Sequence, residues 1–334
     1  MMETSGETEL CFPQLLNASC LKPQRPHFEA MLSYILVFSI SLLTALLNLL
    51  VIISISHFKQ LHTSTNFLLL SLAVSDFLVA PVLLFEIMLI DGCWLFGDLM
   101  CSLYQYVTAV VTSASVGAMI LISVDRYVAI CYPFHYVTEV THKRVQVCVC
   151  LCWICSFIFQ CLILQDNMQQ PGRYNSCVGE CVIVSNYAAG ITDLTFSFIV
   201  PITVIVVLYM RVFVVAVSQA RAMMTHISAV KLQHSMKVTA KAQKSELKAA
   251  RTLGVVVVVF LICLCPYYCV ALSSQDNSMN ASSASYVFVL CLYCSNSCLN
   301  PMIYVCFYPW FRKSIRLIVT LKILEPDSCE TNIL

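Results

Sequence analysis

Two acidic residues lie in parts of the sequence where an ionised carboxylate is costly. Asp193 lies in the apolar run Ile191–Leu208, and no basic residue is close to it in sequence. Glu86 lies in another apolar run, ten residues beyond Asp76. An acid inside such a run usually binds a cation or another polar group. Asp193 is therefore the first candidate for a cation-binding residue, and Glu86 is the second.

The composition indicates the surroundings of these acids. Of 334 residues, 59% are hydrophobic and only 11% are charged, and the mean hydropathy is +0.82. A soluble protein of this length does not have such a composition, so the chain belongs in a lipid bilayer. One helix needs about 20 mostly apolar residues to cross a hydrocarbon core of ~30 Å. The stretches that meet this requirement are 33–56, 66–90, 101–131, 146–165, 187–217, 249–273 and 284–307.

These seven stretches predict an all-α membrane protein, built as a seven-transmembrane helix bundle. We expect three parts: an N-terminal tail over residues 1–32, the bundle over 33–308, and a last part over 309–334. The last part begins with Pro309 and has spaced apolar residues among basic ones, which predicts a short amphipathic helix on the membrane surface, followed by a cytoplasmic tail.

The basic residues predict the orientation of the chain. All but three of the 19 Lys and Arg fall on one face of the predicted bundle, which the positive-inside rule makes the cytoplasmic face. Many lie between residues 221 and 251, where anionic membrane lipid is the expected partner. The N-terminus is then outside the cell, and the first helix is expected to act as the insertion signal. The glycosylation acceptors Asn17 and Asn280 both fall on that outer face.

The 20 cysteines form two groups. Most lie within the predicted helices, where small packing residues are expected. Six lie on the predicted outer face, in an oxidising compartment where thiols pair. Six cysteines allow fifteen full connectivities, and the sequence alone does not choose among them. They are Cys11, Cys20, Cys93, Cys101, Cys177 and Cys181.

Several short motifs follow one another along the predicted helices. They are Asn48, the LAVSD sequence that ends at Asp76, Asp125-Arg126-Tyr127, Trp153, Pro201 with Tyr209, Pro266, and the NPMIY sequence Asn300–Tyr304. As an ordered set they resemble the markers of the rhodopsin-like G-protein-coupled receptors, and the resemblance covers nearly the whole chain. Within that class, Asn296–Phe311 is similar to the seventh-helix pattern of the trace amine-associated receptors. The closely spaced Cys177 and Cys181 resemble the second outer loop of the same receptors.

The resemblance implies two disulfides. Cys101 would pair with Cys181, and Cys20 with Cys177, which ties the N-terminal tail across the mouth of the pocket. Cys11 and Cys93 remain without an assignment.

On the cytoplasmic face, Arg126 follows a long apolar run and needs a partner for its charge. Asp125 beside it and Glu246 at the foot of the sixth helix are the available carboxylates, and such a contact can hold two helices together. In the family that the sequence resembles, this contact is the resting latch, and the arginine is released to meet the G protein. The alternative is a pair of surface ion pairs without consequence. Further residues that the resemblance assigns to activation are Tyr127, Tyr209, Asn300, Pro301 and Tyr304.

A second polar group resembles the sodium-and-water cluster of the family. Its members are Asp76, Asn48, Ser297 and Asn300. Na⁺ at Asp76 is the one cofactor that the sequence suggests, and the alternative is that Asp76 is a hydrogen-bonded structural acid.

The third helix departs from the pattern of amine receptors. Thr108 stands eighteen residues, or about 27 Å of rise, before Arg126, at the position where most amine receptors have the aspartate that binds the ammonium. Asp193 lies about 12 Å before Pro201 on the fifth helix, at similar depth, and a branch of the trace amine-associated receptors has its anionic partner there. The ligand implied is a small amine whose head points toward the fifth helix. Further candidate ligand-binding residues are Thr112, Tyr267, Tyr268 and Tyr293.

Alternatives remain for both acids. Asp193 can instead be protonated, or bound to Thr192, Thr195 or a neighbouring helix. Glu86 can face inward, where a diamine would bridge it to Asp193, or face a water-filled vestibule and pair with Arg173.

Two further departures from the family pattern concern the residues that respond to the bound ligand during activation. Leu264 occupies the place of the sixth-helix tryptophan that lies under the ligand in the family, and Cys291 and Cys294 stand where the seventh helix usually has an aromatic lid. We therefore expect a roomier pocket and a different trigger.

Other functional classes fit less well. A transporter would show internal repeats and broken helices, and this sequence has neither. An enzyme would need a nucleophile with a base or a metal cluster, and the seven His residues have no ligand spacing. A receptor of the same fold for a neutral ligand remains the closest rival. By resemblance, we expect a stimulatory or olfactory G protein, a rise in cyclic AMP, no nucleic-acid partner, and a place in the plasma membrane, with olfactory sensory cilia as the specific site.

Overall fold

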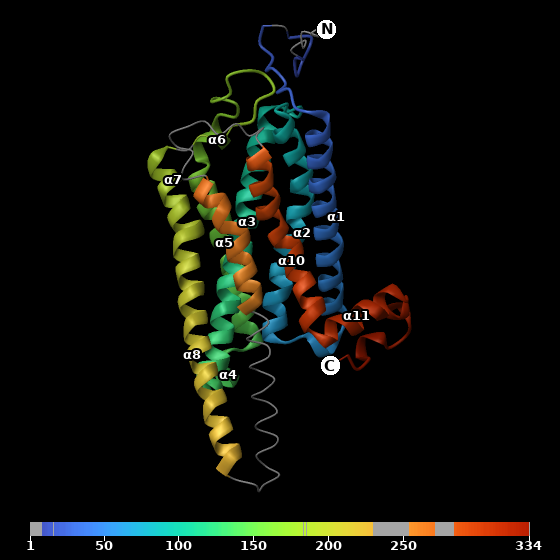
Figure 1. Ribbon diagram of the computed structural model, residues 1–334, viewed down its shortest axis with the longest axis vertical. Coiled ribbons are helices and arrows are strands. Elements are labelled where there is room, and N and C mark those ends of the chain that lie inside the picture. The colour runs from blue at the N-terminus through green and yellow to red at the C-terminus, as the bar shows by residue number, and fades with distance from the viewer. Residues whose placement is uncertain are drawn as a thin grey trace.

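The computed structural model describes residues 9–15, 17–182, 184, 186–229, 254–270 and 284–333. Within them, six helical segments are long and apolar enough to cross a membrane, and the shorter apolar helix Gly254–Val270 is a seventh. The seven segments lie side by side in a bundle (Figure 1), so the predicted seven-helix fold is confirmed. The membrane-length segments are α1 His27–His57, α2 Ser64–Asp91, α3 Gly97–Cys131, α5 His142–Ile163, the joined α7 Tyr187–Leu194, η2 Thr195–Ile199 and α8 Val200–Ala229, and α10 Ala284–Phe307.

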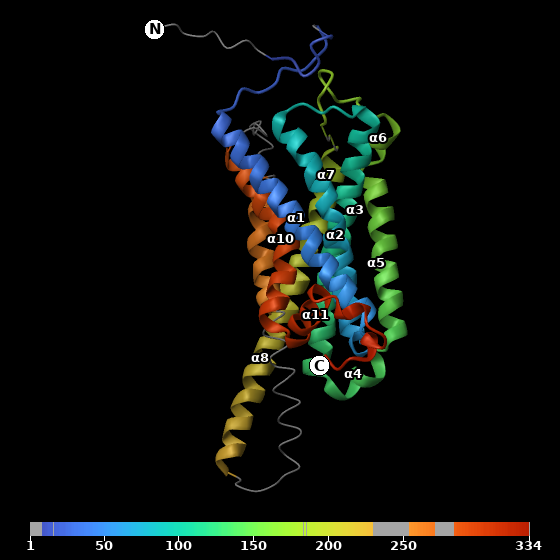
Figure 2. The ribbon, with the colours of Figure 1, turned by 90° about the vertical axis from the view of Figure 1, so that its right-hand side faces the viewer.

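Shorter elements join these segments. They are η1 Lys59–Leu61, α4 Pro133–Glu139, α6 Gln165–Gln169, α11 Pro309–Val319, η3 Lys322–Leu324 and η4 Ser328–Glu330. The N-terminal segment lies at one end of the bundle, which we call the N-side, and the C-terminus lies toward the other end, the C-side (Figures 1 and 2).

The helix bounds differ from the predicted stretches mainly where polar residues extend an apolar run. The first helix begins at His27 rather than at residue 33, because Pro26 precedes it and the acidic Glu29 lies in its first turn. The fifth segment continues to Ala229, beyond the apolar run that ends at 217.

Burial separates central helices from peripheral ones. About half of the apolar stretch is buried inside the bundle in α2, α3 and α10, with values of 56%, 50% and 50%, whereas only 17% is buried in α5. Large apolar side chains such as Leu151 and Ile158 therefore point outward from α5, as expected for a helix that faces lipid. Polar groups on α2, α3 and α10 consequently lie inside the bundle.

The fifth membrane segment has one wide turn between Asp193 and Pro201. At η2, the N–H of Val200 donates to the carbonyl of Thr195, five residues back. Proline has no N–H and disturbs the turn that precedes it, so a π-type turn commonly forms at such a position. The wide turn changes the direction in which the side chains before it point, including that of Asp193.

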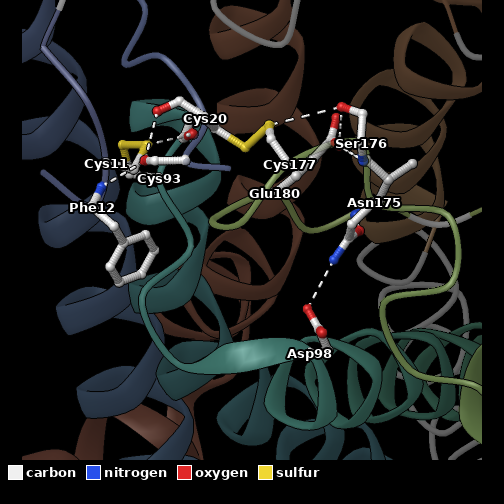
Figure 3. The surroundings of a disulfide bond; sticks show 12 residues. Cys11, Phe12, Cys20, Cys93, Asp98, Asn175, Ser176, Cys177 and Glu180 are labelled. Atoms are coloured by element: carbon white, nitrogen blue, oxygen red, sulfur yellow. Dashed lines mark hydrogen bonds between the residues drawn. A yellow bond between two sulfur atoms is a disulfide. The ribbon is translucent and has the colours of Figure 1, made fainter. Parts of the chain in front are cut away.

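Three disulfides lie on the N-side, and the two drawn in Figure 3 join the N-terminal segment to loops there, while Cys101–Cys181 joins α3 to a loop. Cys101–Cys181 and Cys20–Cys177 are the two pairs that the resemblance implied, and both are confirmed. The third joins Cys11 to Cys93 and was not predicted. Gly92 makes the close approach of the tail to the end of α2 feasible, because it has a φ of 71° and a Cβ there would lie 2.7 Å from the ring of Pro23.

The C-terminal segment folds back onto the turn after α1. The Lys59 ammonium lies 2.8 Å from Glu330, His57 Nε2 lies 3.0 Å from the Ser328 hydroxyl, and the N–H of Ile333 donates to Gln60 over 3.1 Å. Ile333 is 1% exposed. α11 precedes this contact and lies across the C-side of α1 (Figure 2). The residues predicted to form the cytoplasmic tail therefore pack against the bundle.

The Cys11–Cys93 disulfide can be tested by thiol labelling. In Cys93→Ser, the thiol of Cys11 becomes free, so we expect the intact receptor to react with a membrane-impermeant maleimide more than wild type and Cys11→Ser/Cys93→Ser do. The double variant should also unfold at lower temperature, because loss of a disulfide typically lowers stability by about 2–4 kcal/mol. Equal labelling of wild type and Cys93→Ser would show that the bond does not form.

Candidate functional site

A cavity lies among α2, α3, the helix Gly254–Val270 and α10, and its free volume is about 50 Å³. Both of its ends are polar. Glu86 lines one end, and Ser115, Asn296 and Ser297 line the other. The remaining lining residues are Val79, Val82, Leu83, Thr108, Val111, Thr112, Val116, Phe260, Leu264, Tyr293 and Cys294. Of the predicted ligand-binding residues, Glu86, Thr108, Thr112 and Tyr293 therefore lie around one space.

Glu86 faces into the bundle rather than toward Arg173. Its Oε1 accepts a hydrogen bond from the hydroxyl of Tyr104 over 2.5 Å. The guanidinium of Arg173 instead lies 5.6 Å from the ring centre of Tyr174. Among the residues that the structure describes, no ion pair neutralises Glu86. The carboxylate can therefore accept further hydrogen bonds from a cation in the cavity.

Asp193 is half-buried and is not among the residues that line this cavity. Its Oδ1 accepts hydrogen bonds from the Ser197 hydroxyl over 2.7 Å and from Gln160 Nε2 on α5 over 3.2 Å. Thr192 and Thr195, the two alternatives considered for its partners, donate to backbone carbonyls of their own helix instead. The neighbouring-helix alternative is thus the one that the structure contains, through Gln160.

A cluster of aromatic rings connects the regions of the two acids. The ring centres of Tyr293 and Tyr267 lie 4.5 Å apart, those of Tyr267 and Tyr268 lie 5.6 Å apart, and Tyr268 stacks on Phe198 at 4.1 Å. Tyr293 lines the same cavity as Glu86, and Phe198 lies in η2, five residues after Asp193. The rings therefore form a wall between the two carboxylates, and ring faces attract cations.

The inner end of the cavity reaches a buried acid. Ser115 and Ser297 line the cavity, and their hydroxyls donate to Oδ1 of Asp76 over 3.2 and 3.0 Å. Asn300 Nδ2 donates to Oδ2 over 2.8 Å. Leu264, which replaces the tryptophan of the family pattern, is 3% exposed and lines the same space. The cavity thus extends to the donors that hold Asp76.

The first helix is fixed to the same polar group. Asn48 Nδ2 donates to the carbonyl of Ser297 over 2.9 Å and to the carbonyl of Thr44 over 2.9 Å. The four residues predicted for the sodium-and-water cluster, Asp76, Asn48, Ser297 and Asn300, therefore form one hydrogen-bonded group.

Near the C-side, Arg126 is 5% exposed and pairs with Asp125, whose Oδ2 lies 2.5 Å from the guanidinium. Two further residues form hydrogen bonds with this ion pair and were not predicted from the sequence. Thr65 accepts a hydrogen bond from Arg126 over 2.6 Å and donates to Asp125 over 3.0 Å, and Tyr136 donates to Asp125 over 2.9 Å. Burial, with the charge of Asp125 as the next cause, raises the pKa of Tyr136, so its hydroxyl stays a neutral donor. Glu246 lies outside the described residues.

The other predicted activation residues lie along the same half of the bundle. Tyr127 packs against Tyr132 with ring centres 5.8 Å apart. Tyr304 is 1% exposed and belongs to the main apolar core, and Tyr209 packs against that core. Pro301 lies inside α10. Of the two glycosylation acceptors, Asn17 is exposed on the N-side and Asn280 lies outside the described residues.

Comparisons with known proteins agree with the seven-helix fold. Residues 47–304 match the family described as 7 transmembrane receptor (rhodopsin family). Over 337 residues the chain is 35% identical to trace amine-associated receptor 4 of Mus musculus, covering 99% of this chain and 96% of the relative. It is 38% identical to trace amine-associated receptor 8a of Rattus norvegicus, with 96% and 95% covered. It is 35% identical to trace amine-associated receptor 13c of Danio rerio, with 98% and 96% covered.

The contacts of Arg126 generate a prediction for signalling without ligand. Thr65→Val keeps the shape of the side chain but removes both of its hydrogen bonds to the ion pair. We expect basal G-protein activation to rise several-fold, because a hydrogen bond to a charged group contributes about 1.5–3 kcal/mol. Thr138→Val is the matched control, since the Thr138 hydroxyl is exposed and donates only to the carbonyl of His135. Unchanged basal activity in Thr65→Val at equal surface expression would contradict the prediction.

Proposed function

Because the chain belongs to the rhodopsin family of seven-transmembrane receptors, and within it to the trace amine-associated receptors, we propose that it is a receptor for small amines. Members of this family are receptors and not enzymes. One observation carries the proposal. Two carboxylates lie at the two ends of a row of aromatic rings inside the bundle, Glu86 beside Tyr293 and Asp193 near Phe198, and no ion pair joins them to a basic side chain of the described residues.

The surroundings of Asp193 suit an ionised acceptor. Ser197 and Gln160 are neutral donors, and both bonds end on Oδ1. Oδ2 accepts no hydrogen bond from the described residues, so it can accept one from an ammonium. A charge-assisted hydrogen bond contributes about 1.5–3 kcal/mol net, which is enough to select a cation over its neutral analogue. Tyr267 and Tyr268 would supply ring faces to the same ammonium.

Glu86 is the second anionic partner of the proposal. It lines the cavity while Asp193 does not, so a short amine can reach Glu86 without reaching α7. An amine with a second cationic group would meet both acids. Whether one or both acids bind the ligand decides the chain length that the receptor prefers.

Release of Arg126 from Asp125 and Thr65 on activation would free its guanidinium for the G protein. We infer that this partner is of the stimulatory or olfactory type and that cyclic AMP rises. The N-terminus would lie outside the cell, where Asn17 can be glycosylated, and the C-side would face the cytoplasm and its anionic lipids. Plasma membrane is the expected location, and sensory cilia of olfactory neurons are the specific proposal.

The residues around Asp76 fit a sodium ion. Oδ1 of Asn300 is buried and accepts no hydrogen bond from the described residues, and it belongs to the same side chain that donates to Asp76. Asp76, Asn300, Ser115 and Ser297 would hold the ion with oxygen ligands, which hard cations prefer. The ion would supply a positive charge that balances Asp76 in the resting state.

The proposed function is tested by cyclic AMP production in transfected cells. A panel of small amines and their neutral isosteres is applied to wild type, Asp193→Asn and Glu86→Gln at matched surface expression. We expect amines alone to activate wild type, and each substitution of a binding acid to raise the half-maximal concentration by about ten- to a hundredfold. Asp98→Asn is the control, because Asp98 is held by Asn175 on the N-side, outside the tyrosine wall.

Two outcomes would contradict this proposal. If neutral isosteres activate wild type as well as the amines do, the receptor has a non-amine ligand. If both substituted receptors respond as wild type does, the two acids are structural.

A further inference from the structure

Gln160 is a buried glutamine in α5, a helix whose large apolar side chains mostly point outward. It is 3% exposed and ends the narrow seam of buried side chains that begins at Val145. A buried amide needs acceptors for its two N–H groups. Gln160 Nε2 donates to the Ser113 hydroxyl on α3 over 2.8 Å and to Asp193 Oδ1 over 3.2 Å. Gln160 thus joins α5 to α3 and α7 at the acid that is proposed to bind the ligand.

The chemistry of these partners determines which way the amide of Gln160 points. An ionised carboxylate only accepts hydrogen bonds, so the nitrogen of the amide, and not its oxygen, has to face Asp193. The hydroxyl of Ser113 can accept the second N–H. A third contact, from Nε2 to the Ser197 hydroxyl, is longer at 3.5 Å, and the two shorter contacts already use both N–H groups. The amide therefore donates to Asp193 from the α5 side.

Oδ1 of Asp193 has no acceptor capacity left. It accepts from Gln160 and, over 2.7 Å, from the hydroxyl of Ser197, which is 8% exposed. A carboxylate oxygen has about two lone-pair sites, so two donors occupy both of them. Oδ2 accepts no hydrogen bond from the described residues and is not one of their fully buried unpaired atoms. Asp193 is therefore an acceptor with one oxygen available.

The number of available oxygens matters because cations differ in how their N–H groups point. Amidinium and guanidinium groups present two parallel N–H groups and bind a carboxylate best through both of its oxygens. The N–H groups of an ammonium diverge, so one can face the carboxylate while the others face aromatic rings. At Asp193, the second N–H of an amidinium would point at an oxygen whose lone pairs are occupied. That donor would stay unpaired, which is destabilising.

We propose that Gln160 and Ser197 determine the class of cation that the receptor binds. By occupying Oδ1, they make Asp193 selective for the ammonium of an alkylamine over amidinium and guanidinium groups. Both are positioning residues, since they act through Asp193 and not on the ligand. This inference rests on the proposed function, which it narrows to ligands whose head group is an ammonium.

Two pairs of ligands isolate the effect of the head group. Hexan-2-amine and pentanamidine share one skeleton of non-hydrogen atoms, in which a methyl group of the amine replaces one nitrogen of the amidine. 1-Phenylethylamine and benzamidine form a second pair of the same kind, with a ring in place of the chain. All of them are singly charged cations at neutral pH. If neither amine activates, the most potent amine of the panel above replaces them, together with its own amidine.

The quantity measured is the selectivity ratio, which is the half-maximal concentration of the amidine divided by that of its matched amine. G-protein dissociation sensors for each class of G protein give both values at matched surface expression, so the result does not depend on which class couples. An amidine that does not activate is measured by its inhibition of the response to the matched amine.

Wild type should have a selectivity ratio of at least about ten, because one N–H of the bound amidinium lacks an acceptor. Gln160→Met is close in size and unbranched but has no donor, and Ser197→Ala removes the other donor. Each change frees one lone-pair site of Oδ1, so each should lower the ratio several-fold. The double variant should lower the ratio to about one or below, since both oxygens can then accept the fork.

Gln105→Met is the matched control. Gln105 is also a buried glutamine, at 5% exposed, but its Nε2 contacts the sulfurs of Cys101 and Cys181 rather than an acid. The same replacement there should leave the selectivity ratio at its wild-type value. A purely structural role of Gln160 would weaken both ligands of a pair equally and would also leave the ratio unchanged.

The outcomes separate this inference from the proposed function. If the amines activate wild type and the amidines are equally potent, the receptor is an amine receptor and the inference is wrong. A ratio that stays at the wild-type value in Gln160→Met, Ser197→Ala and the double variant overturns it in the same way. If the double variant does not reach the cell surface, the single variants decide by the same criterion. If only neutral compounds activate wild type, the proposed function fails, and this inference fails with it.

Discussion

The need to pair polar groups where no water is available determines much of this structure. Charged and amide side chains inside a membrane bundle must find partners within the protein or bind something from outside. Asp76 has three donors, and Arg126 has Asp125 and Thr65. Each of these groups joins at least two helices, so the pairing of polar side chains also fixes how the helices pack.

Other polar groups inside the bundle are incompletely paired. Glu86 has a single tyrosine donor, Asp193 uses only one of its oxygens, and Asn296 has an unused amide oxygen. The tyrosines lie among them. The charged groups of Asp76 and Arg126 are thus paired within the protein, whereas the carboxylates of Glu86 and Asp193 keep acceptor capacity for a ligand. Because these groups are acceptors, the ligand that suits them is a donor and preferably a cation.

Leu264, in place of the tryptophan of the family pattern, leaves the cavity open toward the interior of the bundle. Leucine is smaller than tryptophan and has no donor, so the cavity reaches Ser115 and Ser297, which are donors to Asp76. A ligand at this inner end would lie against the side chains that hold Asp76, without an aromatic ring between. This arrangement is a physical basis for the different activation trigger that the sequence predicted.

Length, hydropathy and motif order determined the class and the seven helices, because the hydrocarbon thickness and the backbone's need for internal hydrogen bonds leave few alternatives. Two of the three disulfides were implied by the family resemblance alone. The sequence also identified Asp193 and Glu86, since an acid in an apolar run is conspicuous. Only the tertiary structure decided that Cys11 pairs with Cys93, that Gln160 holds Asp193, and that Glu86 rather than Asp193 lines the cavity. These outcomes depend on the rotation of each helix and on the wide turn before Pro201, which bring together residues far apart in the chain, and local sequence patterns do not specify them.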